Sequence, residues 1–300
     1  MTATPTARRI AYAIGLAALA IAGTIVTVRS MDDDRAGTTA RANVAAGLVY
    51  VGADLHSLAV SDRGIYIGGH QAVGASHDAG RSWQRLGSLA NADAIGWAFT
   101  TDAVLVGGHN GLRWSADGQT FALTPTPAAD VHALGASGRT VYLASPAAGV
   151  FRSTDDSQTW HLVNPQTGRS FSGTLIVDPG DHAHVYAADQ AAGAMETHDG
   201  GRTWRSLGAF PGTTSIGWNH TAPELLVVAG AGGGAISHDA GRNWTGLDLP
   251  GGTAVVAVGS APTHPLFAAT WTKGWAQLYR STDQGQSWQP IHSAAAPAVS

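Results

Sequence analysis

An eight-residue pattern recurs six times along this chain, and it constrains the fold more than any other feature of the sequence. Each copy has a Ser or Thr, an Asp two positions later, and an aromatic residue at its end. The copies start at residues 76, 115, 153, 197, 237 and 281, so the steps between them are 39, 38, 44, 40 and 44 residues. A regular period of this length is typical of folds that repeat one supersecondary unit. The pattern therefore predicts a repeat fold over most of the chain.

The residues of the pattern indicate a stapled hairpin. The copies read SHDAGRSW, SADGQTF, STDDSQTW, THDGGRTW, SHDAGRNW and STDQGQSW, so the second is one residue short and the third has Ser157 in place of Gly. Asp and Ser side chains bond to the backbone of their own turn, Gly accepts positive φ, and Trp supplies apolar surface. We therefore predict a structural role for the six aspartates, Asp78, Asp117, Asp155, Asp199, Asp239 and Asp283.

Each period also contains the signals of four short strands. Two apolar runs precede the pattern in the first period, at 56–60 and 65–69; a third strand leads into the pattern and a fourth begins at its Trp. Four strands in about 41 residues form a blade of a β-propeller. We predict an all-β propeller over residues 44–292 with six four-stranded blades, seven being the alternative. The run Val49-Tyr50-Val51 is expected to pair with the last blade and close the ring, which leaves no free strand edge.

The pattern S-x-D-x-G-x-[ST]-W resembles the Asp-box, also called the BNR repeat, which occurs in sialidases, sortilin-type receptors and photosystem II assembly factors. The resemblance covers residues 44–290 and implies a sialidase-superfamily-like propeller, similar to actinobacterial exported Asp-box proteins labelled glycosyl hydrolase. Sialidases carry an F-R-x-P motif and a glutamate that activates a tyrosine nucleophile. Here Phe151-Arg152 is followed by Ser153-Thr154, and the sequence has only two glutamates, Glu196 and Glu224. The resemblance therefore does not extend to standard sialidase chemistry.

An apolar segment near the N-terminus indicates export. Residues 10–28 contain no charge and follow Arg8-Arg9. A helix of this length would span roughly 28 Å, which is close to the hydrocarbon thickness of a bilayer. The positive-inside rule leaves residues 1–9 in the cytoplasm, followed by a transmembrane anchor or cleaved signal segment at 10–28 and a linker at 29–43. The propeller is then extracytoplasmic on a single-pass membrane protein, or secreted if the segment is cleaved, and residues 293–300 form a flexible tail.

Composition excludes several classes of function. The formal net charge of −4 gives no electrostatic reason for a nucleic-acid partner. The absence of cysteine removes disulfides, thiolate metal sites and cysteine nucleophiles. No cofactor is expected, apart from the divalent metal considered below, and the chain is expected to be a monomer.

Candidate ligand-binding residues lie where the first strand of a blade begins and where its second strand ends, because both positions reach the face opposite the staples. The patterns Asp54-x-His56, Asp93-x-Ile95 and Asp130-x-His132 precede first strands, and Gly-Gly-His sequences follow second strands. We predict a ligand site from His56, His70, His109, His132 and Asp189. A long connection at 269–275 carries two aromatic residues that we expect to form one wall of this site, Trp271 and Trp275.

Three kinds of chemistry are compatible with this site. Imidazole and carboxylate groups are ordinary zinc ligands, so His56, His70, His109 and His132 are candidate metal ligands. The same residues could form a polar site without metal, or their side chains could bond only to loop backbone. We favour a membrane-tethered propeller that binds a protein, peptide or glycan. The alternative is a glycoside hydrolase-like enzyme, whose catalytic carboxylates would come from Asp54, Asp93 and Asp130.

Overall fold

The structure, a computed structural model, describes residues 47–259 and 263–291. Within these ranges there is no α-helix, and no helix is long and apolar enough to cross a membrane. The predicted cytoplasmic residues 1–9, the span at 10–28, the linker at 29–43 and the tail at 293–300 lie outside the described residues.

The strands fall into six sets of four, which we number in chain order. Set 1 contains β2 (Ser57–Ser61), β3 (Gly64–Gly68), β4 (Val73–Ser76) and β5 (Gln84–Arg85). After a short 3₁₀ turn (Gly87–Leu89), set 2 contains β6 (Gly96–Phe99), β7 (Val104–Gly108), β8 (Gly111–Ser115) and β9 (Ala122–Thr124). Set 3 contains β10 (Ala133–Ser137), β11 (Thr140–Ser145), β12 (Gly149–Ser153) and β13 (His161–Asn164).

The second half of the chain repeats this order. Set 4 contains β14 (Phe171–Val177), β15 (Val185–Asp189), β16 (Gly193–Thr197) and β17 (Arg205–Gly208). Set 5 contains β18 (Thr213–Trp218), β19 (Leu226–Gly230), β20 (Gly233–Ser237) and β21 (Thr245–Leu247). Set 6 contains β22 (Thr253–Val258), β23 (Leu266–Thr272), β24 (Trp275–Ser281) and β25 (Gln289–Pro290). Pairing within each set is antiparallel, whereas β10 and β14 pair in parallel and join sets 3 and 4 into one eight-stranded sheet.

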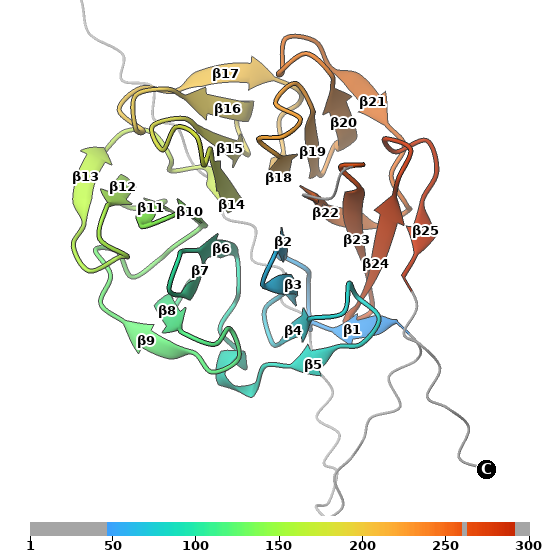
Figure 1. The fold of residues 1–300 in the computed structure, drawn as a ribbon, viewed down its shortest axis with the longest axis horizontal. Helices are drawn as coiled ribbons and strands as arrows, with labels where there is room; N and C mark the ends of the chain where they lie inside the picture. The colour runs from blue at the N-terminus through green and yellow to red at the C-terminus, as the bar shows by residue number, and fades with distance from the viewer. Residues whose placement is uncertain (1–46, 260–262, 292–300) are drawn as a thin grey trace, which may run out of the picture. The chain divides into compact units, whose positions relative to one another are not determined.

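The sets lie side by side around a common centre, with β2, β6, β10, β14, β18 and β22 innermost (Figure 1). Neighbouring innermost strands contact one another around the whole ring, including β22 with β2. The all-β arrangement of antiparallel sheets is consistent with a β-propeller. β1 (Leu48–Tyr50) pairs with β24, with Val49 opposite Ala276, so the predicted closure by the first strand is confirmed.

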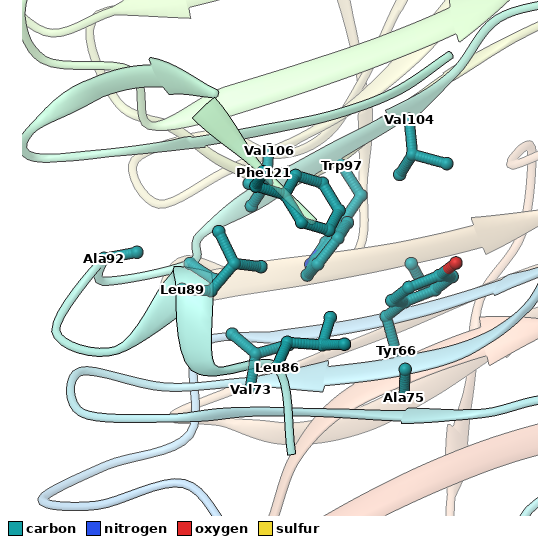
Figure 2. Close-up of a cluster of buried hydrophobic side chains, with 12 residues drawn as sticks. Tyr66, Val73, Ala75, Leu86, Leu89, Ala92, Trp97, Val104, Val106 and Phe121 are labelled. Carbon is teal, nitrogen blue, oxygen red and sulfur yellow. The ribbon is translucent and has the colours of Figure 1, made fainter. Parts of the chain in front are cut away.

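The hydrophobic core is divided into clusters that lie between adjacent sets. Figure 2 shows the cluster between sets 1 and 2, where the rings of Tyr66 and Trp97 lie 4.8 Å apart. The terminal aromatic residue of each repeat packs against the cluster between its own set and the preceding one, as Phe121 and Trp244 do. The repeats therefore join neighbouring sheets as well as closing their own hairpins.

The hairpin staples share one pattern of hydrogen bonds in five of the six repeats; in the shorter second repeat, Asp117 instead accepts from the N–H groups of Gln119 and Thr120. In the first, Ser76 Oγ donates to Asp78 Oδ1 at 2.9 Å and accepts from the Gly80 N–H at 2.8 Å, while the Ser82 N–H and hydroxyl both donate to the Asp78 carboxylate. The third repeat keeps this turn because Ser157 adopts the left-handed conformation, with a φ of 66°. Its N–H donates to Ser153 Oγ at 3.0 Å, so the missing Gly does not disrupt the hairpin.

Candidate functional site

The two ends of the strand sets carry different chemistry. In set 1, Ser57 pairs with Gly68 and Gly68 with Val73 at one end, whereas Ile65 pairs with Ser76 at the other. The repeats therefore lie on one face, which we call the box face. The starts of the innermost strands and the connections from second to third strands lie on the opposite face, which we call the channel face.

Seven His and Asp side chains from sets 1, 2 and 3 gather on the channel face. We call them the His/Asp cluster: Asp54, His56, His70, Asp93, His109, Asp130 and His132. The histidines follow one another in a row, with ring centroids 4.7 Å apart for His56 and His70, 6.3 Å for His70 and His109, and 4.8 Å for His109 and His132. The structure thus brings together four histidines that lie far apart in the sequence.

The contacts in this row run through carboxylates. His56 Nε2 lies 2.8 Å from His70 Nδ1, and Asp54 Oδ1 lies 3.1 and 2.6 Å from these two atoms. Asp93 Oδ1 is 3.1 Å from His56 Nε2, and Asp93 Oδ2 contacts His109 Nδ1. At the end of the row, His132 Nε2 lies 3.1 Å from Asp130 Oδ1. Overlapping groups of three along this row have ligand atoms close enough to hold a metal ion.

Asp93 lies at the centre of the cluster and is only 4 % exposed. Its φ of 54° is unusual for a residue other than Gly, although Asp tolerates it better than most. Burial alone would raise the pKa of Asp93, but the neighbouring His56, His109 and His70 outweigh burial and hold that pKa below its ordinary value. Asp93 is therefore an ionised carboxylate among imidazole rings.

This environment shifts the pKa values of two histidines in opposite directions. The hydrogen bond to Asp54 raises the pKa of His70. Burial lowers the pKa of His132, and Asp130 offsets this only in part. Near neutral pH, His132 is consequently a neutral imidazole with a free lone pair, which is the form that binds metals.

Two glycines allow the aspartates to approach the histidines. A Cβ on Gly69 would lie 2.1 Å from the Asp54 carbonyl oxygen, and one on Gly108 would lie 2.1 Å from that of Asp93. Any side chain at these positions would displace the Asp-bearing loops. The Gly-Gly-His sequences therefore combine an imidazole with the close backbone approach that only Gly permits.

A buried hydrogen-bond network holds the Asp93 loop in place. Ser57 Oγ donates to the Ala94 carbonyl at 2.7 Å and accepts from Trp97 Nε1 at 2.9 Å. These bonds join β2 to the start of set 2 directly beneath the cluster. The loop that carries Asp93 is thus fixed between sets 1 and 2.

Beside the cluster, a polar cavity of about 330 Å³ opens at the starts of the innermost strands. Its polar lining comes from four different sets and consists of His56, Ser172, Gln190, Thr214 and Thr253. His56 belongs to both the cavity and the His/Asp cluster. A ligand in this cavity would therefore contact the cluster.

Three other predicted site residues are engaged elsewhere. Asp189 accepts hydrogen bonds from Ser170 Oγ and from the N–H groups of Ala191 and Ala192, so its carboxylate caps a turn of set 4. The expected long connection at 269–275 is wrong, because β23 and β24 are joined by a tight turn in which Lys273 and Gly274 have positive φ. Such two-residue turns match the twist of the flanking strands.

The two tryptophans of this hairpin contact the segment that closes the ring. Trp271 Nε1 donates to the Gly52 carbonyl at 2.9 Å, and the Trp275 ring meets the Tyr50 ring edge-on at 5.4 Å. Both contacts are with β1 and the residues after it. We therefore do not include these tryptophans in the candidate site.

Sequence reasoning missed one cluster, which lies toward the box face of set 4. Glu196 is 4 % exposed and contacts His184 at 3.0 Å, His198 at 3.2 Å and the Arg205 guanidinium. Burial would raise the pKa of Glu196, but these partners lower it to about 2. The rarity of glutamate in this chain was the one signal that could have pointed to it. Because Arg205 already neutralises the carboxylate, this cluster is a satisfied ionic network.

Comparisons with known proteins agree with this architecture. The profile of the BNR/Asp-box repeat matches residues 279–290. A GH74 xyloglucanase from Xanthomonas campestris has a similar structure, with a TM-score of 0.57 and 17 % identity over 82 % of this chain and 46 % of that one. An ancestral GH74 enzyme has a TM-score of 0.54 and 20 % identity over 80 % of this chain and 39 % of that one. The chain therefore spans less than half the length of either GH74 structure.

A smaller protein matches over most of its length. The structure of YCF48 bound to D1 peptide has a TM-score of 0.51 and 17 % identity over 81 % of this chain and 84 % of that one. A comparison with curated proteins gave no match. At these identities the structural similarities concern the fold. Together, these findings show a BNR/Asp-box repeat at 279–290 within an all-β fold that is consistent with a β-propeller.

Proposed function

We propose that this chain is a recognition propeller that binds a polar ligand on its channel face. The observation that carries the proposal is the junction at His56, where the polar cavity meets the His/Asp cluster. Ligand sites are concave and contain a small number of convergent polar groups, and this region has both properties. The six strand sets would form a closed six-bladed ring, so that residues from four sets converge on the same cavity.

The lining of the cavity favours a peptide or a glycan as ligand. Ser172, Gln190, Thr214 and Thr253 offer hydroxyl and amide groups, which bond to the backbone of a peptide or the hydroxyls of a sugar. Both classes are represented among similar folds, by the peptide-bound YCF48 structure and by the xyloglucanase. The chain would bind as a monomer.

Binding without turnover is favoured over the glycosidase alternative. A two-carboxylate glycosidase needs one carboxylic acid whose pKa is raised, so that it stays protonated and can donate to the leaving group. The pKa of Asp93 is instead lowered by its histidine neighbours. Asp93 is therefore unsuited to the role of general acid, and we do not assign catalytic roles to Asp54 or Asp130.

The proposal also places the propeller outside the cytoplasm. Support comes from the uncharged run at 10–28 after Arg8-Arg9, which suits an exported chain whether the segment is retained as an anchor or cleaved. A reporter fused after residue 300 and tested for access to an impermeant label on intact cells addresses this directly. Labelling only after lysis would contradict the export proposal.

The ligand proposal is tested with arrays of peptides and glycans probed with the full-length chain. Thr214→Trp would fill the polar cavity, so we expect capture to fall at least tenfold relative to the unaltered chain. Thr245→Trp makes the same change on the exposed outer strand β21 and serves as the control. Equal capture by both variants would contradict the proposed site, and turnover of an arrayed glycan would favour the glycosidase alternative.

A further inference from the structure

We propose that the His/Asp cluster holds two divalent transition-metal ions of the Zn²⁺ type, bridged by the Asp93 carboxylate. The ligands of the first ion would be Asp54 Oδ1, His56 Nε2, His70 Nδ1 and Asp93 Oδ1. The ligands of the second would be Asp93 Oδ2, His109 Nδ1, Asp130 Oδ1 and His132 Nε2. The inference concerns the channel face and rests on the proposed function for the role of the ions, which is to bind an anionic ligand.

The four atoms of the first site are spaced like ligands around one cation. Of the six distances between pairs of these atoms, five measure 2.6, 2.8, 3.1, 3.1 and 3.5 Å. The edge of a regular tetrahedron is about 1.6 times its centre-to-corner distance, so metal–ligand bonds of about 2.0–2.2 Å give edges of about 3.3–3.6 Å. The observed distances average about 3.0 Å, a few tenths of an ångström shorter, and the shortest of them is about 0.7 Å shorter. This cage is too small for a water molecule and has the size of a first-row cation.

Hydrogen bonds cannot account for all of these contacts. The two ring nitrogens carry at most one proton each, and ionised carboxylates carry none. At most two of the five short contacts can therefore have their own proton, and the remaining three would bring electronegative atoms together with no hydrogen between them. A cation at the centre removes this repulsion, because it accepts all four lone pairs at once.

The second site is defined by buried atoms that have no hydrogen-bond partner. Among the described residues, both oxygens of Asp93, Oδ1 of Asp130 and Nε2 of His132 are buried without such a partner. Imidazole nitrogens lie near the Asp93 oxygens, but their directions do not fit hydrogen bonds. Leaving a buried charged group unpaired is costly. All four orphaned atoms are ligands in the proposed assignment.

Asp93 is the one carboxylate placed to bridge the two sites. Its Oδ1 faces His56 and His70, whereas its Oδ2 contacts His109. A carboxylate can bind one cation with each oxygen, and paired-metal sites hold their ions about 3.5–4 Å apart. The left-handed backbone at Asp93 presents both oxygens to the row of histidines. Strain of this kind is typical of functional positions.

The sequence shows the same symmetry. Asp54-x-His56 and Gly-Gly-His70 supply the first site, while Gly-Gly-His109 and Asp130-x-His132 supply the second. Each site thus receives one Asp-x-His pair and one Gly-Gly-His, and Asp93 is shared. Both motifs of the first site come from set 1, whereas those of the second site come from sets 2 and 3.

The ligand set selects the kind of ion and the kind of ligand. Two imidazoles and two carboxylates per ion suit Zn²⁺ and its neighbours, whereas Ca²⁺ and Mg²⁺ prefer oxygen alone. The side chains of His70 and His109 are 43 and 47 % exposed, so the cluster is open to solvent. An anionic oxygen donor could approach the ions from there. We therefore assign to the channel face a ligand with a carboxylate, from either a peptide or a sugar acid.

The test is a metal titration of the full-length chain, purified in mild detergent and stripped with a chelator. We expect two Zn²⁺ per chain by calorimetry and by elemental analysis after dialysis, and no uptake of Ca²⁺ or Mg²⁺. His70→Ala and His109→Ala should each retain one ion. Asp93→Asn should weaken both sites more than about 100-fold, because even an outer-shell partner is worth 10- to 100-fold in affinity. His161→Ala, an exposed histidine on β13, should still bind two ions.

Several outcomes would overturn the proposal. These are no uptake, one ion in the unaltered chain, or two ions bound by Asp93→Asn with undiminished affinity. Thermal melts of the metal-free variants check that each one folds. Failure of the proposed function is distinguishable: arrays that capture nothing while two Zn²⁺ bind would contradict recognition alone. If the arrays still capture the chain after chelation, the proposed recognition function holds, but the metal has no role in ligand binding.

Discussion

The two faces of this propeller use aspartate in opposite ways. On the box face, Asp78 accepts hydrogen bonds from Ser76, from the Ser82 N–H and from the Ser82 hydroxyl. On the channel face, Asp93 is buried and neither of its oxygens receives a hydrogen bond. A carboxylate with all its bonds made inside its own turn is a structural element. A buried carboxylate with none, held only by the charges of neighbouring histidines, is the feature on which the proposed metal site rests.

The same contrast holds for serine. Ser76 at the box face is buried and fully bonded, whereas Ser145, at the end of β11 on the channel face, is buried and its hydroxyl has no partner. Ser145 occupies in set 3 the position of Gly69 and Gly108, which directly precede His70 and His109 in sets 1 and 2. Among the described residues, buried polar atoms without a partner occur on both faces, but the carboxylate with both oxygens unpartnered is Asp93, on the channel face.

The largest effect on stability is expected at Gly108. Gly108→Ala places a Cβ 2.1 Å from the Asp93 carbonyl oxygen, which forces the loop away. We expect a loss of about 2–3 kcal/mol in the free energy of unfolding, as overpacked sites usually show. Gly246→Ala is the control, because a Cβ there meets nothing within 4 Å. Urea unfolding of both variants gives the comparison, and equal stability would show that the Asp93 loop moves freely.

Next in size is the effect of removing a box-face hydroxyl. Ser76→Ala leaves the buried Gly80 N–H without its acceptor, which should cost about 2 kcal/mol. Ser145→Ala removes an equally buried hydroxyl that has no partner, so its stability should be unchanged or slightly higher. Thermal unfolding of the pair measures the difference between the faces. A larger loss for Ser145→Ala would reverse the comparison.

The box-face carboxylates should also make stability depend on acid. Four of these carboxylates have a pKa that is lowered from 3.8 to about 2, mainly because a side chain four residues later in the sequence donates a hydrogen bond to them. They are Asp78, Asp155, Asp239 and Asp283. Because the folded pKa is below the unfolded one, their contribution is complete above about pH 4 and is lost as the pH falls toward 2. Melting temperatures measured from pH 5 to 2 should fall over this window. In Asp78→Asn the fall should be shallower, and an identical slope would contradict the assignment.

The smallest effect is expected for Asp93 in the metal-free chain. Asp93→Asn keeps the size of the side chain and suits the left-handed backbone, while it removes a charge that has no hydrogen bonds. We expect less than about 1 kcal/mol of change in the free energy of unfolding at pH 8, in either direction. A loss of several kcal/mol without metal would indicate that Asp93 is a structural residue, like those of the boxes.

Much of the architecture could be predicted from local patterns in the amino-acid sequence. The six repeats predicted the hairpins, and the apolar runs predicted four strands in each period, because both depend on neighbouring residues. The run at Val49 predicted ring closure, because an exposed first strand needs a partner. The connection at 269–275 was predicted wrongly, since Lys273-Gly274 makes a two-residue turn that the flanking Trp and Thr residues conceal.

The site was predicted only in part. Repeat register placed His56, His70, His109 and His132 on one face, and the structure brings them together. The repeat register could not show that the Asp189 carboxylate accepts hydrogen bonds within its own turn. It also could not show that Glu196 contacts two histidines and an arginine. Those differences depend on side-chain directions and on contacts between distant residues.

The amino-acid sequence alone determined the repeat, the strands and the face on which the histidines lie, because each follows from local periodicity and turn chemistry. Only the tertiary structure decided which polar atoms remain without partners. That outcome depends on how closely neighbouring sets approach, and two glycines and one left-handed aspartate control the approach at the channel face.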